Sequence, residues 1–312
     1  MCKIKGIRMK SYCLFILMLV NLSVCSVAEE VSKKTKSSMP TVLVTSYNTK
    51  KTYLIDPEGA IIWQRRMPGA CLDSWKLNNG NFLISGGNKV CEVTPKGKEV
   101  WGYTSPKGVK TEINTCQPLP DGRVMIAESG TCRIVELNQG KIVKEVKLKI
   151  RGNAHSQMRI ARKTTKGTYV VCCMHENTVR EFNDKGKCIQ VITAEMMKKQ
   201  GVKWDHVHGI VCLDNGNWLV SGGYTGHLAE IDKNNKVVWT LKPEDVPGLG
   251  FSFVAGCSRL KDGTTVVTGY RSRYPLFAVD KNKKVLWKYP SPKSGRLTHV
   301  QVLGDTGKGS NR

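Results

Sequence analysis

Histidines are the residues of this sequence best suited to chemistry, because a neutral imidazole can act as a nucleophile, an acid–base catalyst or a metal ligand. Four of the six histidines lie close to the start of a strand-like segment or in a loop between two such segments: His155, His175, His208 and His299. His208 and His299 each precede a turn glycine by eight residues. If these segments repeat around one axis, the four imidazoles are expected at one rim.

Other polar side chains at related positions complete a candidate ligand-binding set. We predict that this set comprises Asp73, Asn114, Glu128, His155, His175, His208, Tyr224, Arg271 and His299, with Glu176 and Arg273 beside it. Arginine and imidazole groups are typical of sites that bind carboxylate or sulfate groups. The candidates for a catalytic role are the three histidines His155, His208 and His299.

The segment His206-Val207-His208 offers a metal site as an alternative. If it lies on a strand, residues two apart share a face, and His155, His299 or Gln301 could complete a divalent metal site. Counting from Leu213 and Leu303, however, the registers of His208 and His299 differ by one, which would turn one ring away. No CxxC pair is present, so a zinc ribbon is not supported.

The elements that position these residues form a repeat of about 40–50 residues. One turn, rich in Asp, Asn, Pro and Gly, occurs at residues 56–59, 94–97, 137–140, 183–186, 232–235 and 280–283. A second turn, ending in glycine, occurs at residues 79–80, 121–122, 166–167, 215–216 and 262–263. Short apolar segments flank every turn, so each repeat predicts four antiparallel strands, which is the composition of a propeller blade.

The two ends of the repeat array predict how the ring closes. The first strand-like segment, residues 41–46, corresponds to the second strand of a blade, and residues 297–303 correspond to an unpartnered first strand. Pairing the two removes both exposed sheet edges. The sequence therefore predicts an all-β, six-bladed β-propeller over residues 41–303, closed by its C-terminal strand.

The blade repeats resemble those of the quinoprotein-like (PQQ-like) propeller superfamily. The residues that carry the resemblance are 76–87 (KLNNGNFLISGG), 93–101 (VTPKGKEVW) and their repeats. The quinone dehydrogenases of that superfamily are longer and have calcium-binding carboxylates and a vicinal disulfide. Here Cys172 and Cys173 are adjacent, but neighbouring side chains of a strand face opposite ways. We therefore expect no PQQ and regard both thiols as packing residues.

The segment Trp204-Asp205-His206-Val207-His208 is also similar to a segment of the six-bladed arylsulfate sulfotransferases. That resemblance implies sulfuryl transfer, with His299 or His208 as the nucleophile, His155 as its acid–base partner and Arg271 as the anion clamp. Propeller polysaccharide lyases use a similar His-x-His segment, which implies metal-assisted glycan cleavage.

The N-terminus predicts export. Residues 1–28 have a basic start, an apolar run and a Ser-Val-Ala end, as in a signal peptide. Residues 29–40 are expected to be a flexible linker and 304–312 a tail. Export would be to the periplasm or the exterior; Cys25 offers an alternative lipid-anchoring site, and no transmembrane span is expected after cleavage.

The net charge limits the classes of partner, and the number of cysteines bears on whether the chain has disulfides. The formal net charge of +24 favours polyanionic partners, but export and the lack of recognition motifs argue against nucleic acid. Nine cysteines follow residue 28, an odd number that favours buried free thiols over a disulfide scaffold. We predict a monomeric binding propeller for an acidic or sulfated glycan, a small anion or a protein partner. The alternative is a propeller enzyme with a central histidine site.

Overall fold

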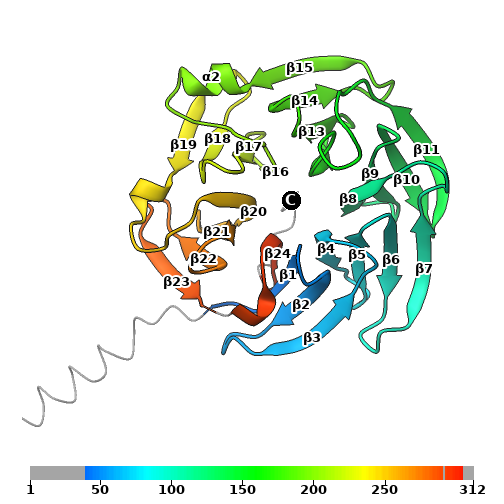
Figure 1. The fold of residues 1–312 in the computed structure, drawn as a ribbon, viewed down its shortest axis with the longest axis horizontal. Helices are drawn as coiled ribbons and strands as arrows, with labels where there is room; N and C mark the ends of the chain where they lie inside the picture. Colours follow the sequence, from blue (N-terminus) through cyan, green and yellow to red (C-terminus); the bar gives the residue numbers. More distant parts are fainter. Residues whose placement is uncertain (1–38, 291, 305–312) are drawn as a thin grey trace, which may run out of the picture. The chain divides into compact units, whose positions relative to one another are not determined.

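Six four-stranded antiparallel sheets are arranged around one central axis (Figure 1). The computed structural model describes residues 39–290 and 292–304. The first three blades are blade 1, β24 (Leu297–Val302), β1 (Val42–Ser46), β2 (Lys51–Ile55) and β3 (Ile61–Arg66); blade 2, β4 (Cys71–Lys76), β5 (Phe82–Gly86), β6 (Lys89–Val93) and β7 (Glu99–Thr104); and blade 3, β8 (Glu112–Pro118), β9 (Val124–Ser129), β10 (Arg133–Asn138) and β11 (Lys141–Lys147).

The remaining blades have the same order from the axis outward. They are blade 4, β12 (Ala161–Lys163), β13 (Tyr169–Cys173), β14 (Thr178–Phe182) and β15 (Cys188–Thr193); blade 5, β16 (Gly209–Cys212), β17 (Trp218–Ser221), β18 (Leu228–Ile231) and β19 (Val237–Leu241); and blade 6, β20 (Phe253–Arg259), β21 (Thr265–Arg271), β22 (Leu276–Val279) and β23 (Val285–Tyr289). Three short helices connect strands within residues 39–304: α2 (Ala194–Lys198), η1 (Pro243–Asp245) and η2 (Pro292–Ser294).

The predicted closure of the ring is confirmed. Strand β24 pairs antiparallel with β1, and the register places Val42 opposite Val302 and Thr45 opposite His299. The Leu303 N–H donates to the Thr41 carbonyl at 2.8 Å, which extends the pairing beyond the strands. The six-bladed fold predicted from the repeats is therefore the fold of this chain.

The turns predicted from the repeats have the expected backbone. Gly80, between the first two strands of blade 2, has a φ of 84°, and Gly216 at the corresponding place in blade 5 has a φ of 82°. Only glycine adopts this left-handed conformation without steric cost. The turns between first and second strands thus all lie at one end of the propeller, and the starts of the first strands lie at the other.

Apolar contacts between neighbouring blades form the core. Among the described residues, six clusters of buried side chains each join two adjacent blades, and the cluster between blades 4 and 5 also includes Leu72 of blade 2. Tryptophans on the outermost strands reach across: Trp63 Nε1 donates to the Pro95 carbonyl at 2.9 Å, and Trp239 Nε1 donates to the Lys281 carbonyl at 3.0 Å. In blades 1 and 5 the repeated tryptophan therefore bonds to the next blade, whereas Trp101 Nε1 donates to Glu92 within blade 2.

Several predictions lie outside the described residues. These are the signal peptide at residues 1–28, the acylation site at Cys25, the expected linker up to Ser38 and the expected tail after Gly304. Within the described part of the chain, no helix is long and apolar enough to span a membrane.

Candidate functional site

A row of aromatic rings crosses the end of the axis where the first strands begin. In order it contains His155, Tyr47, Tyr270, Phe253, Tyr224 and His206, and neighbouring ring centroids are 4.7–6.5 Å apart. The rings come from blades 1, 4, 5 and 6, because Tyr47 follows β1, Tyr270 is near the end of β21 and Phe253 begins β20. Edge and tilted contacts at these separations are favourable. We call this end of the propeller the channel mouth.

A polar cluster continues the row on the blade 3 side. His155 Nδ1 lies 3.1 Å from Glu112 Oε1, and Arg159 donates to His155 Nε2 at 2.7 Å and to Glu112 Oε2 at 3.3 Å. A guanidinium only donates hydrogen bonds, so Nε2 accepts and Nδ1 carries the proton that is given to Glu112. Burial opposes ionisation of Glu112, but the His155 hydrogen bond and the Arg159 charge lower the pKa of its carboxyl.

At the channel mouth Tyr47 is half-buried and Arg159 is buried. Burial raises the pKa of Tyr47, so its hydroxyl remains a hydrogen-bond donor at neutral pH. Burial lowers the pKa of Arg159, which is 2% exposed, and the charge of Glu112 opposes that effect. Tyr47 therefore offers a donor at the mouth, whereas the Arg159 guanidinium is already bonded to His155, Glu112 and Met174.

His208 lies behind Phe253 and is 5% exposed, with ring centroids 5.5 Å apart. Its Nδ1 donates to the Ala255 carbonyl at 2.9 Å, which leaves the lone pair on Nε2. Burial, reinforced by the positive charge of Arg159, lowers the pKa of His208 to about 3. The imidazole is therefore neutral at physiological pH.

This low pKa predicts a pH-dependent stability. The unfolded chain binds a proton at His208 below pH of about 6.5 and the folded chain does not, so the free energy of unfolding falls as pH decreases. We expect His208→Gln to reduce that fall by up to about 1.4 kcal/mol per pH unit between pH 6.5 and 5. Urea unfolding at several pH values measures it. Equal slopes for variant and wild type would contradict a neutral buried His208.

Arginines lie beside Tyr270 and Tyr224 of the aromatic row. A pocket of about 370 Å³ in blade 6 is lined by Arg271, Arg273 and Arg296 together with Tyr270, and no acidic residue is among the described residues that line it. The Arg271 guanidinium lies 5.0 Å from the Tyr224 ring centre, and that of Arg296 lies 5.3 Å from Tyr270. Stacked guanidinium groups keep their donors available to a ligand.

A larger pocket of about 670 Å³ adjoins the mouth between blades 1, 2 and 3. Tyr47 and Glu112 belong both to its lining and to the mouth, and Lys50 and Lys110 add two positive charges. Tyr47 lines the larger pocket and Tyr270 lines the smaller one. The two rings contact each other in the aromatic row, which therefore connects the pockets. Together they are the candidate binding site.

Two predicted site residues lie deeper along the axis instead. Asp73 and His299 are 0% and 3% exposed and contact Arg162, which is also buried. Arg162 Nη1 donates to Asp73 Oδ2 at 2.8 Å, and His299 Nε2 lies 3.3 Å from Arg162 Nη2 and from Asp73 Oδ1. The predicted gathering of His155, His208 and His299 at one rim is therefore divided between two depths, and Asp73 and His299 link blades 1, 2 and 4.

Three further predicted residues have contacts of their own. Glu128 is buried and bonded to Arg133, Tyr103 and Thr131. Asn114 donates to the Met158 carbonyl at 2.8 Å. His175 is exposed in the loop after β13. Of the predicted set, the mouth therefore contains His155, His208, Tyr224 and Arg271, and Asn114 also lines the larger pocket that adjoins it.

The prediction that His206 and His208 lie on a strand is wrong. Both precede β16, and His206 has a φ of 63°, which reverses the chain. The exposed His206 contacts Asp205 at 2.6 Å and the Tyr224 ring, whereas His208 is buried. Among the described residues, no group of three His, Cys, Asp or Glu could hold a metal ion.

The cysteines pack as small apolar side chains. All nine after residue 28 are free, and seven of them are buried. Cys172 belongs to the core between blades 4 and 5, and Cys173 to the core between blades 3 and 4. This confirms that the two adjacent thiols face opposite sides of β13.

Sequence reasoning missed several residues of the mouth. They are Tyr47, Glu112, Arg159, Phe253, Tyr270 and Arg296. Tyr47 occupies the loop between second and third strands in blade 1, the position from which Tyr224 was predicted in blade 5. An equal inspection of all six such loops would have found it. Tyr270 directly precedes the predicted Arg271 on β21. The other four lie at or just before a first strand, so their identification required the register of these innermost strands.

The fold and the mouth define a six-bladed β-propeller with an aromatic and arginine-lined end. The Mal s 1 allergenic protein-like family matches residues 55–284, and the chain belongs to that family. No curated protein matches it.

Solved structures of similar fold extend this comparison. A protein of unknown function from Bacteroides caccae is 23% identical, with a TM-score of 0.75 over 84% of this chain and 98% of its own. A virginiamycin B lyase from Staphylococcus aureus, solved with quinupristin, is 14% identical, with a TM-score of 0.58 over 82% of this chain and 86% of its own. A streptogramin B lyase is likewise 14% identical, with a TM-score of 0.57 over 83% and 85%. At these identities the likeness concerns the fold.

Proposed function

We propose that this protein is an exported binding propeller that takes an acidic or sulfated glycan at the channel mouth. The observation that carries the proposal is the pocket lined by Arg271, Arg273 and Arg296 with the half-buried Tyr270, next to the exposed ring of Tyr224. Arginine binds carboxylate and sulfate groups through paired donors, and aromatic rings provide an apolar surface for the C–H faces of sugar rings. The N-terminal sequence supports export, and the blade repeats support kinship with the quinoprotein-like propellers.

The charges around the mouth favour an anion over a neutral sugar. Arg271 and Arg296 are exposed, and each is held against a tyrosine ring rather than against a carboxylate. Lys50 and Lys110 extend the positive surface into the larger pocket, where Glu112 is already engaged by His155 and Arg159. A chain of sugars with several acidic groups could therefore contact both pockets at once.

The contacts of His155 favour binding over catalysis. Its Nε2 lone pair accepts a hydrogen bond from Arg159 at 2.7 Å, so the ring would have to break that contact before acting as a base, a nucleophile or a metal ligand. In its present position His155 instead orients Glu112 and Arg159. The cluster serves as a fixed wall of the site.

Loss of the exposed arginines tests the proposal. In calorimetric titrations with a sulfated oligosaccharide and with polygalacturonate, we expect Arg271→Ala and Arg296→Ala each to weaken binding about tenfold. Binding to the wild type should also weaken as salt is added. Lys141→Ala is the matched control, because it removes one exposed positive charge from the outer strand β11. Equal affinities of all three variants, or wild-type binding of neutral dextran alone, would contradict the proposal.

A second candidate is an enzyme that uses His208. A neutral imidazole with its Nδ1 proton held by a carbonyl has the state that a nucleophile requires, with the lone pair on Nε2. Incubation with an aryl sulfate, and separately with sulfated glycan, separates the two functions. Turnover that is lost in His208→Ala supports the enzyme, whereas binding without turnover supports the binding propeller.

A further inference from the structure

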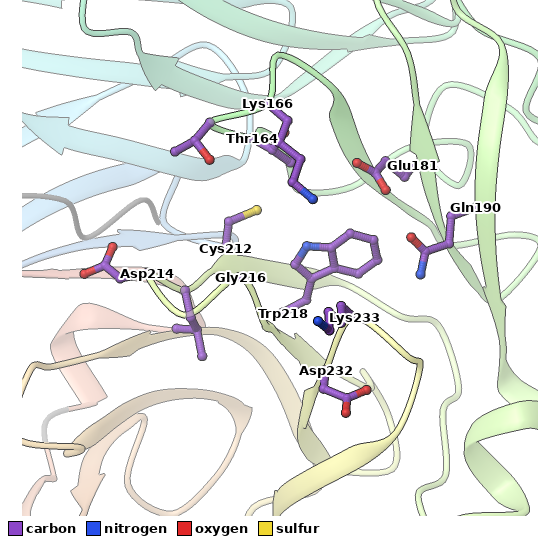
Figure 2. Close-up of a pocket in the computed structure, with 12 residues that line it drawn as sticks. Thr164, Lys166, Glu181, Gln190, Cys212, Asp214, Gly216, Trp218, Asp232 and Lys233 are labelled. Atoms are coloured by element: carbon purple, nitrogen blue, oxygen red, sulfur yellow. The ribbon is translucent and has the colours of Figure 1, made fainter.

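The opposite end of the propeller has a further pocket, between blades 4 and 5 (Figure 2). Its volume is about 260 Å³, and its lining includes the turns at residues 164–166 and 213–216, which connect first to second strands. The channel mouth lies at the starts of the first strands, so the two sites are at different ends. A volume below the roughly 300–1,000 Å³ of drug-sized sites suits one small ligand.

An indole ring forms the apolar part of this pocket. Figure 2 shows Trp218, the first residue of β17, in the middle of the lining residues, with Cys212 beside it. Burial raises the pKa of the Cys212 thiol to about 12, so the sulfur stays protonated and adds to the apolar wall. Within the described part of the chain, no hydrogen-bond acceptor contacts the indole N–H.

The polar part of the pocket is fixed by hydrogen bonds. Thr168 donates its hydroxyl proton to Glu181 and contacts the hydroxyl of Thr164 at 2.6 Å. Gln190 donates to the Asn235 side-chain oxygen at 2.7 Å and thereby joins the outer strand of blade 4 to a turn of blade 5. These bonds hold a carboxylate and an amide around the indole before any ligand arrives.

The charges of the lining are nearly balanced, unlike those of the mouth. Lys166 from blade 4 and Lys233 from blade 5 lie on two sides of the indole (Figure 2). The acids of the lining are Glu181, Asp214 and Asp232. No ion pair or hydrogen bond joins either ammonium group to another described residue. The rim thus offers both donors and acceptors and no excess of positive charge.

We propose that this pocket binds a single neutral pyranose. A pyranose has an apolar C–H face that can lie on the indole, and ring hydroxyls that both donate and accept hydrogen bonds. Glu181 and Gln190 accept or donate on one side, and Lys166 and Lys233 donate on the other. The pocket is independent of the glycan site at the mouth. A glycan-binding protein with both sites would bind a neutral sugar at one end and an acidic sugar at the other.

Ligand-observed NMR with the methyl pyranosides of glucose, galactose and mannose tests this assignment. We expect a Kd of about 1 mM for at least one of them, and a loss of about 30-fold or more in Trp218→Ala. Trp218→Phe retains an apolar ring in the core and should weaken binding less. Glu181→Gln, which keeps an acceptor for Thr168, should weaken binding with the stability unchanged.

Two controls make the result specific. Trp287→Phe alters a tryptophan on the outer strand β23 and should leave pyranose binding intact. Arg271→Ala should also leave it intact, so failure of this proposal and failure of the proposed function are distinguishable. The assignment is overturned if none of the three pyranosides binds the wild type, if binding persists in Trp218→Ala, or if glucuronate or adenine binds in their place.

Discussion

Removal of the closing strand is expected to abolish the folded propeller. A chain that ends at residue 295 lacks β24, whose Leu297, Val300 and Val302 are at most 3% exposed. Burying such side chains contributes about 1.5–3 kcal/mol each, and the lost ladder to β1 adds about 1 kcal/mol per hydrogen bond. The sum approaches the roughly 5–15 kcal/mol by which domains are stable. We expect loss of the cooperative thermal transition and aggregation through the bare edge of β1.

A circular permutant provides the control. Placing residues 296–304 directly before residue 39 restores the strand at the other end of the chain, because Leu303 already pairs with Thr41. The new connection would have the length of the turn at residues 77–81, with Leu303 in the place of Leu77 and Pro40 in that of Gly80, whose φ is 84°. Because proline cannot adopt a positive φ, the permutant also carries Pro40→Gly. A cooperative transition close to that of the full chain is expected for the permutant. If the truncated chain melts like the full chain, closure does not stabilise the ring.

Closure was predictable from sequence because it depends on local patterns. Turn residues such as those at 79–80 and 215–216 specify their own backbone conformation, and the order of strands around them is repeated five times. A chain that begins with a second strand and ends with a first strand leaves one arrangement without open edges. Neither step requires knowledge of distant contacts.

The depth of the site residues was not predictable in the same way. Asp73 and His299 were assigned to the rim from their places before turns, but both contact Arg162, which is 89 and 137 residues away in sequence. Such contacts follow from the three-dimensional register of six blades. Glu128 is a different case, because its partner Arg133 is directly opposite it across a hairpin. That pair could have been inferred from the spacing, and it would have removed Glu128 from the candidate set.

The contact between Asp73 and Arg162 yields the second large prediction. Asp73→Ala is expected to lower the free energy of unfolding by about 3–5 kcal/mol, because it leaves a buried guanidinium without its carboxylate. Arg162 is 1% exposed, and its other contacts are the Ala161 carbonyl, His299 and the face of Trp75 at 5.3 Å. Urea unfolding followed by tryptophan fluorescence measures the change.

Removing both charges separates the cost of an unpaired charge from the value of the pair. The double variant Asp73→Leu/Arg162→Met should be closer in stability to the wild type than Asp73→Ala, because buried ion pairs often contribute little net free energy compared with apolar side chains. Binding at the channel mouth should survive in the double variant, since Asp73 lies below the aromatic row. If Asp73→Ala lowers the free energy of unfolding by less than about 1 kcal/mol, water or His299 compensates the charge of Arg162. The buried triad would then not stabilise the contact between blades 1, 2 and 4.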